Sequence, residues 1–282
     1  MNDLIQEKLK DYNCQSQEDE ENALKKITQE LALYCLMKTG FFEKASFQGG
    51  TCLRIVYGQK RFPEDLDFAL LYPDVNFDIN SYLMQMAEMM KVYGYQIEIR
   101  GEDHANHNVR SRLIKDDSIN KLLYLKHHAD YRKKIQIKIE LDVNPPGEAS
   151  FEINYLDFPT DFMIKTMDIP SLFAGKCHAL LCRNYVKGRD WFDYLWYLKR
   201  ETKINFLMLK NALFQFGPWK NQNIEINLDW LITELENKII QIDWQEAKKD
   251  VERFLRSDQM DELTLWSRDF FLKKTKKISR NK

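Results

Sequence analysis

Residues 133–143 carry the pattern that most constrains the fold, because polar and apolar side chains alternate from Lys134 to Val143. The apolar positions are Ile135, Ile137, Ile139 and Leu141, and the polar positions between them are Gln136, Lys138, Glu140 and Asp142. A period of two places these sets on opposite faces of a β-strand. The segment 144–147, with two prolines and a glycine, ends the strand. The chain therefore contains a sheet with one apolar and one polar face.

The rest of the front half mixes helical and extended patterns. Apolar residues at helical spacing predict helices over residues 20–38, 51–57 and 79–93, with Thr51 near the N-cap of the second. Short strands are predicted over residues 45–47, 65–70, 96–100 and 122–125.

The pattern changes after about residue 169, and only helices are predicted beyond it. They cover residues 172–183, 191–200, 206–216, 228–240 and 244–254. We therefore expect an α+β fold, in which a domain with a mixed sheet (residues 1–165) is followed by a helical domain (residues 166–282).

Composition excludes several classes of protein. The 282 residues are 44% hydrophobic, enough for a core, but no run approaches the ~20 apolar residues of a membrane helix. The first residues are acidic and polar, unlike a secretory signal. The five cysteines form no C-x-x-C pair, so a disulfide framework or zinc knuckle is not expected. A reducing cytoplasm without membrane attachment is the expected location.

The end of the chain is strongly basic although the net charge is only −1. Residues 273–282 contain six basic side chains and no acidic one. Such a segment suits contact with an RNA backbone or an acidic partner, and a solvated helix end is the plainer alternative.

Two short motifs carry the chemistry. Gly49 and Gly50 lie between a predicted strand and a predicted helix, where glycines let a backbone approach phosphate groups. Asp65 and Asp67 follow fifteen residues later, at positions i and i+2 of a predicted strand, so both carboxylates leave one face. Two such carboxylates can hold Mg²⁺ ions together with triphosphate oxygens. Each motif alone is common in turns and strand ends, but the ordered combination is specific.

A third acid is expected on the alternating strand of residues 133–143. Glu140 and Asp142 share its polar face with Lys138. If this strand lies beside the one with Asp65 and Asp67, either acid can complete the metal site or accept a proton. Parity does not choose between them, and a solvent-facing polar row is the alternative.

The helical half contributes further charged candidates. Lys176 and Arg183 lie seven residues apart, on one helix face, where they can hold phosphate charge. Asp190 and Asp193 lie at i and i+3 at the start of the next helix, a position where acids often only complement the helix dipole. Trp191 beside them is a candidate neighbour for a nucleobase.

These motifs resemble those of known nucleotidyltransferases. The paired glycines followed by Asp-x-Asp resemble the signature of the superfamily related to DNA polymerase β. The longer series Gly-Gly-x-x-Leu-Arg, Asp-Leu-Asp-Phe, a helical lysine and Arg-Asp-x-x-Asp resembles the AbiEii/MenT family of nucleotidyltransferase toxins, over about residues 47–197. The resemblance implies a nucleotidyltransferase fold in the first domain, with the helical domain completing the active site.

The resemblance also implies roles for individual residues. Expected catalytic residues are Asp65, Asp67, Lys176, Asp190 and Asp142, with Mg²⁺ on Asp65 and Asp67. Superfamily members usually carry the third acid near such a strand end, which favours Asp142 over Glu140. Expected substrate-binding residues are Gly49, Gly50, Thr51, Arg54, Arg61, Arg183 and Asp193.

The expected function is transfer of a nucleoside monophosphate from an NTP to an acceptor hydroxyl. The resemblance favours the 3′ end of tRNA as acceptor, growth inhibition or phage defence as outcome, and a cognate antitoxin as partner. Basic residues Arg54, Lys60 and Arg61 near the acids also suit a polyanion. Two alternatives remain: modification of a protein or a small molecule such as an aminoglycoside, and a binding module with a retired site.

Overall fold

The computed structural model describes residues 2–62, 65–102, 108–116, 118, 135–222, 224–255 and 259–278. The chain forms two compact units. We call the first the α+β unit; it comprises Met1–Gly58, Phe62–Pro145 and Phe151–Thr166. The second, the helical unit, comprises Gln59–Arg61, Pro146–Ser150 and Met167–Lys282. The predicted α+β class, with a mixed sheet followed by helices, is confirmed.

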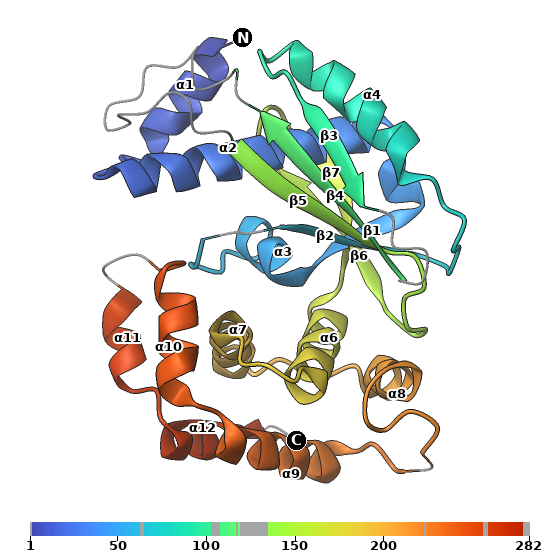
Figure 1. Cartoon of the computed structure of the whole chain (residues 1–282), viewed down its shortest axis with the longest axis vertical. Helices are drawn as coiled ribbons and strands as arrows, with labels where there is room; N and C mark the ends of the chain where they lie inside the picture. The colour runs from blue at the N-terminus through green and yellow to red at the C-terminus, as the bar shows by residue number, and fades with distance from the viewer. Residues whose placement is uncertain are drawn as a thin grey trace. The chain divides into compact units, whose positions relative to one another are not determined.

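The α+β unit is built on a seven-stranded sheet of order β3-β4-β5-β2-β1-β7-β6 (Figure 1). The strands are β1 (Ala45–Gln48), β2 (Leu66–Leu70), β3 (Glu98–Glu102), β4 (Val109–Asp116), β5 (Ile135–Asp142), β6 (Phe151–Leu156) and β7 (Phe162–Met167). Strand β2 runs antiparallel to β1 and parallel to β5, and β1 runs parallel to β7. The sheet is therefore mixed, and β2 and β5 lie side by side at its centre.

The helices of this unit are α1 (Asn2–Asp11), α2 (Gln17–Lys38), α3 (Gly49–Ile55) and α4 (Ile79–Lys91), with a 3-10 turn over Phe41–Glu43. Ser16 and Asp78 cap α2 and α4 by accepting hydrogen bonds from backbone N–H groups of their first turns. The long α2 crosses behind the strands and packs on α4 and β5 (Figure 1). Between helices and sheet lies an aromatic cluster that includes Phe41 and Phe68, whose ring centroids are 5.1 Å apart.

The helical unit contains α6 (Ile169–Cys182), α7 (Gly188–Lys199), α8 (Phe206–Gln215), α9 (Leu228–Gln241), α10 (Trp244–Glu252), α11 (Met260–Thr264) and α12 (Arg268–Thr275). Asp168 caps α6, and Pro170 occupies its first turn, where a missing N–H costs nothing. The core of the unit is aromatic: Trp244 stacks on Phe271 with centroids 4.0 Å apart, and Trp191 meets both rings edge-on.

Several elements were not predicted from the sequence. They are α1, β4, β6, β7, α11 and α12. The predicted strand over residues 122–125 lies outside the described residues. The helix predicted over residues 51–57 begins earlier than expected: α3 covers Gly49–Ile55 with Gln48 as N-cap, and Thr51 is buried in its first turn. Gly49 takes a left-handed φ of 76°, which turns the chain into the helix two residues earlier than expected.

No helix in the described part of the chain is long and apolar enough to cross a membrane.

Two helical glycines provide a matched test of packing in the helical unit. A Cβ on Gly188 would lie 1.9 Å from the backbone oxygen of Ala247, so α7 and α10 would have to separate. A Cβ on Gly175 in α6 would meet its nearest neighbour at 3.9 Å. We expect Gly188→Ala to lower the free energy of unfolding by about 1–3 kcal/mol. Gly175→Ala should raise it by about 0.5–1 kcal/mol. Urea denaturation followed by circular dichroism measures both, and equal stability of the two variants would contradict the expectation.

Candidate functional site

The paired glycines and the Asp-x-Asp motif form one feature of the α+β unit. Gln48 at the end of β1 pairs with Asp67 on β2, which brings Gly49 against that aspartate. A Cβ on Gly49 would lie 2.3 Å from Asp67 Oδ2 and 2.9 Å from Asp67 Cβ. Both the left-handed φ and the lack of space therefore require glycine at this position.

A row of charged side chains extends from Asp67 across one face of the sheet. Asp65 directly precedes β2, and Asp67 is the second residue of that strand; both are half-buried. In the parallel register of β2 and β5, Glu140 lies opposite Asp67. Because paired residues point to the same side, the two carboxylates share a face, while Leu66 and Ile139 are fully buried on the other.

Lys138 belongs to the same row and forms an ion pair with Glu140. The hydrogen bond to Glu140 raises the pKa of Lys138, and burial opposes it. The negative charges of Glu140, Asp65 and Asp67 raise this pKa further. Three carboxylates and one ammonium therefore interact electrostatically on this face.

Asp142, expected as the third acid, lies farther from Asp67 than Glu140 does. It pairs with Ala69, two residues along β2 from Asp67, a displacement of about 6.6 Å. Its Oδ1 accepts a hydrogen bond of 2.9 Å from the backbone N–H of Asn144, and burial raises its pKa. The register thus favours Glu140 over Asp142 as the acid beside Asp67.

The oxygen donors on this face suit a magnesium ion shared with a substrate. In the described residues, no group of three or more His, Cys, Asp or Glu side chains is arranged to hold a metal ion by itself. Mg²⁺ in phosphoryl-transfer sites is commonly bound by one or two carboxylates plus substrate phosphates. Asp65 and Asp67 fit that donor set.

The charged residues of the helical unit form a second cluster. Lys176 on α6 places its Nζ 2.7 Å from Asp190 Oδ1 and 2.9 Å from Asp193 Oδ2, both on α7. Arg183, which caps the C-terminus of α6, pairs with the other oxygen of Asp190. The two cations that the sequence placed on one helix face therefore converge on one carboxylate.

Arg61 completes this cluster from the segment Gln59–Arg61. Its Nε and Nη2 lie 2.7 and 2.9 Å from the two carboxylate oxygens of Asp193, a bidentate arrangement. Gln59 donates a further hydrogen bond of 3.2 Å to Asp193 Oδ1. The cluster holds three cations against two carboxylates, and the side chain of Asp193 is 0% exposed.

Opposite charges outweigh burial for both acids of this cluster. Burial alone would raise the pKa of Asp193, but Arg61 and Lys176 lower it to well below its usual range. Lys176, Arg183 and Lys187 likewise lower the pKa of Asp190 against the effect of burial. Carboxylates held in this way are poor proton acceptors. Asp190 is therefore better suited to orienting Lys176 than to accepting a proton.

The other predicted site residues are placed as follows. Arg54 is half-buried in the last turn of α3, and Thr51 is buried in the same helix. Trp191 is only 2% exposed and packs in the aromatic core, so the expectation that it neighbours a nucleobase is wrong. Gln59 was missed because a glutamine in a basic loop gives no signal in the sequence.

Comparison with known families decides the identity. The model of the nucleotidyl transferase AbiEii toxins, of type IV toxin–antitoxin systems, matches residues 31–274. This chain belongs to the AbiEii family of nucleotidyltransferase toxins. Membership makes it a transferase that uses an NTP and implies a cognate antitoxin.

Two solved structures share the fold of this AbiEii protein. One is JHP933 from Helicobacter pylori, with a TM-score of 0.52 and 18% identity, covering 90% of this chain and 94% of the other. A second solved structure, of a Helicobacter pylori protein whose proposed activity is nucleotidyl transfer, gives a TM-score of 0.51, 17% identity and the same coverage. At this identity the likeness concerns the fold alone. No functionally curated protein matches the sequence significantly.

The buried pairing of Asp193 predicts a pH-dependent stability. Because its pKa is lowered in the folded protein, its contribution is complete above the ordinary carboxyl pKa of 3.8. That contribution is lost as the pH falls below this value. We expect Asp193→Asn to lower the free energy of unfolding by about 3–5 kcal/mol at pH 7, since it leaves Arg61 and Lys176 short of a partner.

Urea denaturation at several pH values between 3 and 7 checks this prediction, with Asp161→Asn as the control at an exposed position. The wild type and the control should lose stability below pH 4, and Asp193→Asn should lose less. A variant as stable as the wild type at pH 7 would show that Asp193 anchors nothing.

Proposed function

We propose that this AbiEii protein transfers a nucleoside monophosphate to the 3′-terminal hydroxyl of tRNA in a reaction that requires Mg²⁺. The observation that carries the proposal is the packing of Gly49 against Asp67, with Glu140 opposite on β5. This arrangement joins a close-approach glycine to carboxylates on one sheet face, as a triphosphate with its metal requires.

The proposed reaction forms one bond and breaks another. The acceptor oxygen attacks the α-phosphorus, the bond from that phosphorus to the bridging oxygen breaks, and pyrophosphate leaves. Asp65 and Asp67 would hold Mg²⁺, which supplies charge stabilisation for the attacking and leaving oxygens when bound. Gly49 and Gly50 would let the phosphates approach the backbone. Glu140 would orient the acceptor hydroxyl and take its proton.

We further propose that Lys176 neutralises phosphate charge during transfer. This role is supported by the family resemblance and by the net positive charge of its cluster, three cations against two carboxylates. Asp190 and Asp193 would act as positioning residues that fix the Lys176 ammonium. The main role of Arg61 and Arg183 would be to hold these two carboxylates in place. Contact with the substrate would be secondary.

The acceptor class and the biological setting rest on the family. Modification of tRNA would stop translation, which accounts for growth inhibition by a cytoplasmic toxin and for a use in phage defence. Modification of a protein or a small molecule is the alternative, and it shares the same acids and the same leaving group.

The test is incubation of the purified protein with each α-³²P-labelled NTP, Mg²⁺ and total bacterial tRNA. We expect label on tRNA with at least one NTP. Loss of a metal ligand should reduce the rate at least about a hundredfold in Asp67→Ala. The matched control, Asp161→Ala, removes an exposed carboxylate and should keep the wild-type rate. Omitting Mg²⁺ or adding EDTA should abolish labelling.

Other outcomes separate the alternatives. Label on protein or on a small molecule, absent with Asp67→Ala, would keep the reaction and replace the acceptor. No label on any acceptor, together with no binding of NTP and Mg²⁺ by calorimetry, would indicate a retired site.

The third acid is tested by a pair of substitutions on one strand. Because Glu140 lies opposite Asp67 and Asp142 lies two residues beyond, Glu140→Gln should lower the transfer rate about ten- to a hundredfold or more. Asp142→Asn should change it less than about threefold. The same labelling assay, run as single turnovers, measures both, and the reverse order would return the role to Asp142.

A further inference from the structure

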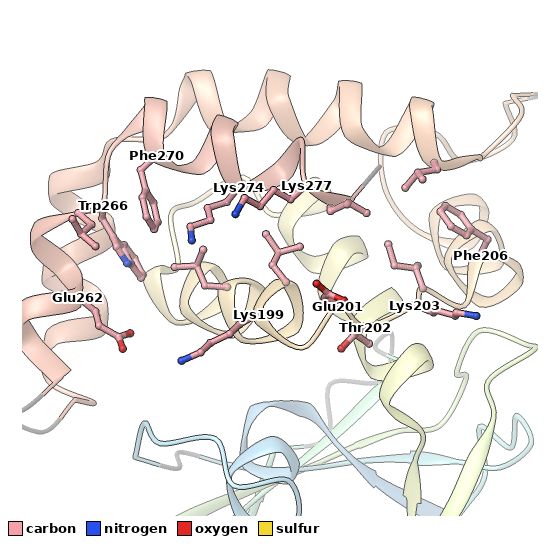
Figure 2. A pocket seen from close by; sticks show the side chains of 16 residues that line it. Lys199, Glu201, Thr202, Lys203, Phe206, Glu262, Trp266, Phe270, Lys274 and Lys277 are labelled. Carbon is pink, nitrogen blue, oxygen red and sulfur yellow. The ribbon is translucent and has the colours of Figure 1, made fainter. Parts of the chain in front are cut away.

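The helical unit contains a groove that lies apart from the Lys176 cluster. Its volume is about 900 Å³, and the end of α7, the start of α9, and helices α11 and α12 contribute to its walls. Figure 2 shows side chains from these helices projecting into a common space. We call it the lysine groove, for the four lysines among its lining residues.

The floor of the lysine groove is apolar. Leu195 and Leu198 line it from α7, and Trp266 and Phe270 line it from the chain around the start of α12. Leu195, Leu198 and Phe270 are half-buried, so their apolar surface is still partly accessible. Covering such a strip with another apolar surface is favourable at about 25 cal/mol per Å².

The rim of the groove is positively charged along both sides. Lys199 and Lys203 flank it where α7 leads into α8, and Lys274 and Lys277 flank it at the end of α12 (Figure 2). Among the described residues, none of these four lysines has an ion-pair partner. Only two acids, Glu201 and Glu262, line the same groove, which leaves an excess of positive charge.

We propose that the lysine groove binds an acidic amphipathic helix of a partner protein. An amphipathic helix presents one apolar stripe with charged residues on either side of it. Laid along the groove, the stripe would cover Leu195, Leu198 and Phe270, and flanking acids would meet lysines on both rims. The charge complementarity, positive rims in a chain of net charge −1, selects the acidic class of partner.

The apolar floor distinguishes this occupant from RNA. A phosphodiester chain needs cations but gains nothing from an aliphatic strip between them. Base stacking would need an open aromatic face. Of the three aromatic side chains that line the groove, Trp266 is only 2% exposed, and Phe206 and Phe270 are half-buried. Lys274 and Lys277 belong to the basic run for which the sequence left RNA and an acidic partner open, and the floor favours the partner. Arg280 and Lys282 of that run lie outside the described residues.

The probe is a fluorescein-labelled synthetic helix of about 18 residues, or five turns, with leucine along one face and glutamate on the others. Its binding to the full-length protein is followed by fluorescence anisotropy. We expect Lys274→Glu with Lys277→Glu to weaken binding at least about tenfold, because both charges on one rim are reversed.

Lys273→Glu with Lys276→Glu is the matched control. It makes the same change of charge near the same end of α12, and neither residue lines the groove. This control should change the affinity less than about twofold. Circular dichroism confirms that both double variants are folded.

Four results would overturn the proposal. The first is no binding of the peptide, and the second is equal binding of a peptide with the same composition and scattered leucines. The third is displacement of the labelled peptide by single-stranded RNA at the concentration at which unlabelled peptide displaces it. The fourth is self-association in gel filtration that the Lys274→Glu, Lys277→Glu variant abolishes, because the occupant would then be a second copy of this chain.

Discussion

The buried charges of Asp190 and Asp193 impose the constraint on which the start of the helical unit depends. Two buried carboxylates are tolerable only because three cations from two segments reach them: Lys176 and Arg183 from α6 and its C-cap, and Arg61 from a distant loop. Each cation in turn depends on those carboxylates. The first two turns of α7 therefore fix the C-terminal half of α6 and the segment Gln59–Arg61. Trp191, in the first turn of the same helix, packs in the aromatic core. Breaking one pair leaves a buried charge, so the elements hold together as a unit.

The local pattern of the sequence was sufficient for the central strand, the long helices and the location of the acids. Alternation over residues 135–142 reflects burial on one face, which is a property of single residues. Strands β6 and β7 gave no such signal, because Ile153, Tyr155 and Met163 are apolar and yet exposed. Helix α12 was not predicted because basic residues dominate the end of the sequence, although Phe271 packs it into the core.

For the candidate site too, the sequence predicted what depends on neighbouring residues and missed what depends on residues far apart in the chain. Parity placed Glu140 and Asp142 on one face, but only the β2–β5 register distinguishes them, and register depends on pairing between segments far apart in the sequence. The partner of Arg61 is 132 residues away in the chain. From the sequence, the guanidinium of Arg61 was therefore interpreted as a basic group near the acids. In the structure it forms a buried ion pair with Asp193.

The position of the Asp67 carboxylate depends on the absence of a side chain at Gly49. A β-carbon at position 49 would lie 2.3 Å from Asp67 Oδ2, too close for both atoms to keep their places. One methyl group at that position would displace the carboxylate or the backbone where the chain enters α3. If Asp67 holds the metal as proposed, one substitution at Gly49 would inactivate the toxin while every acid of the site stays in the sequence.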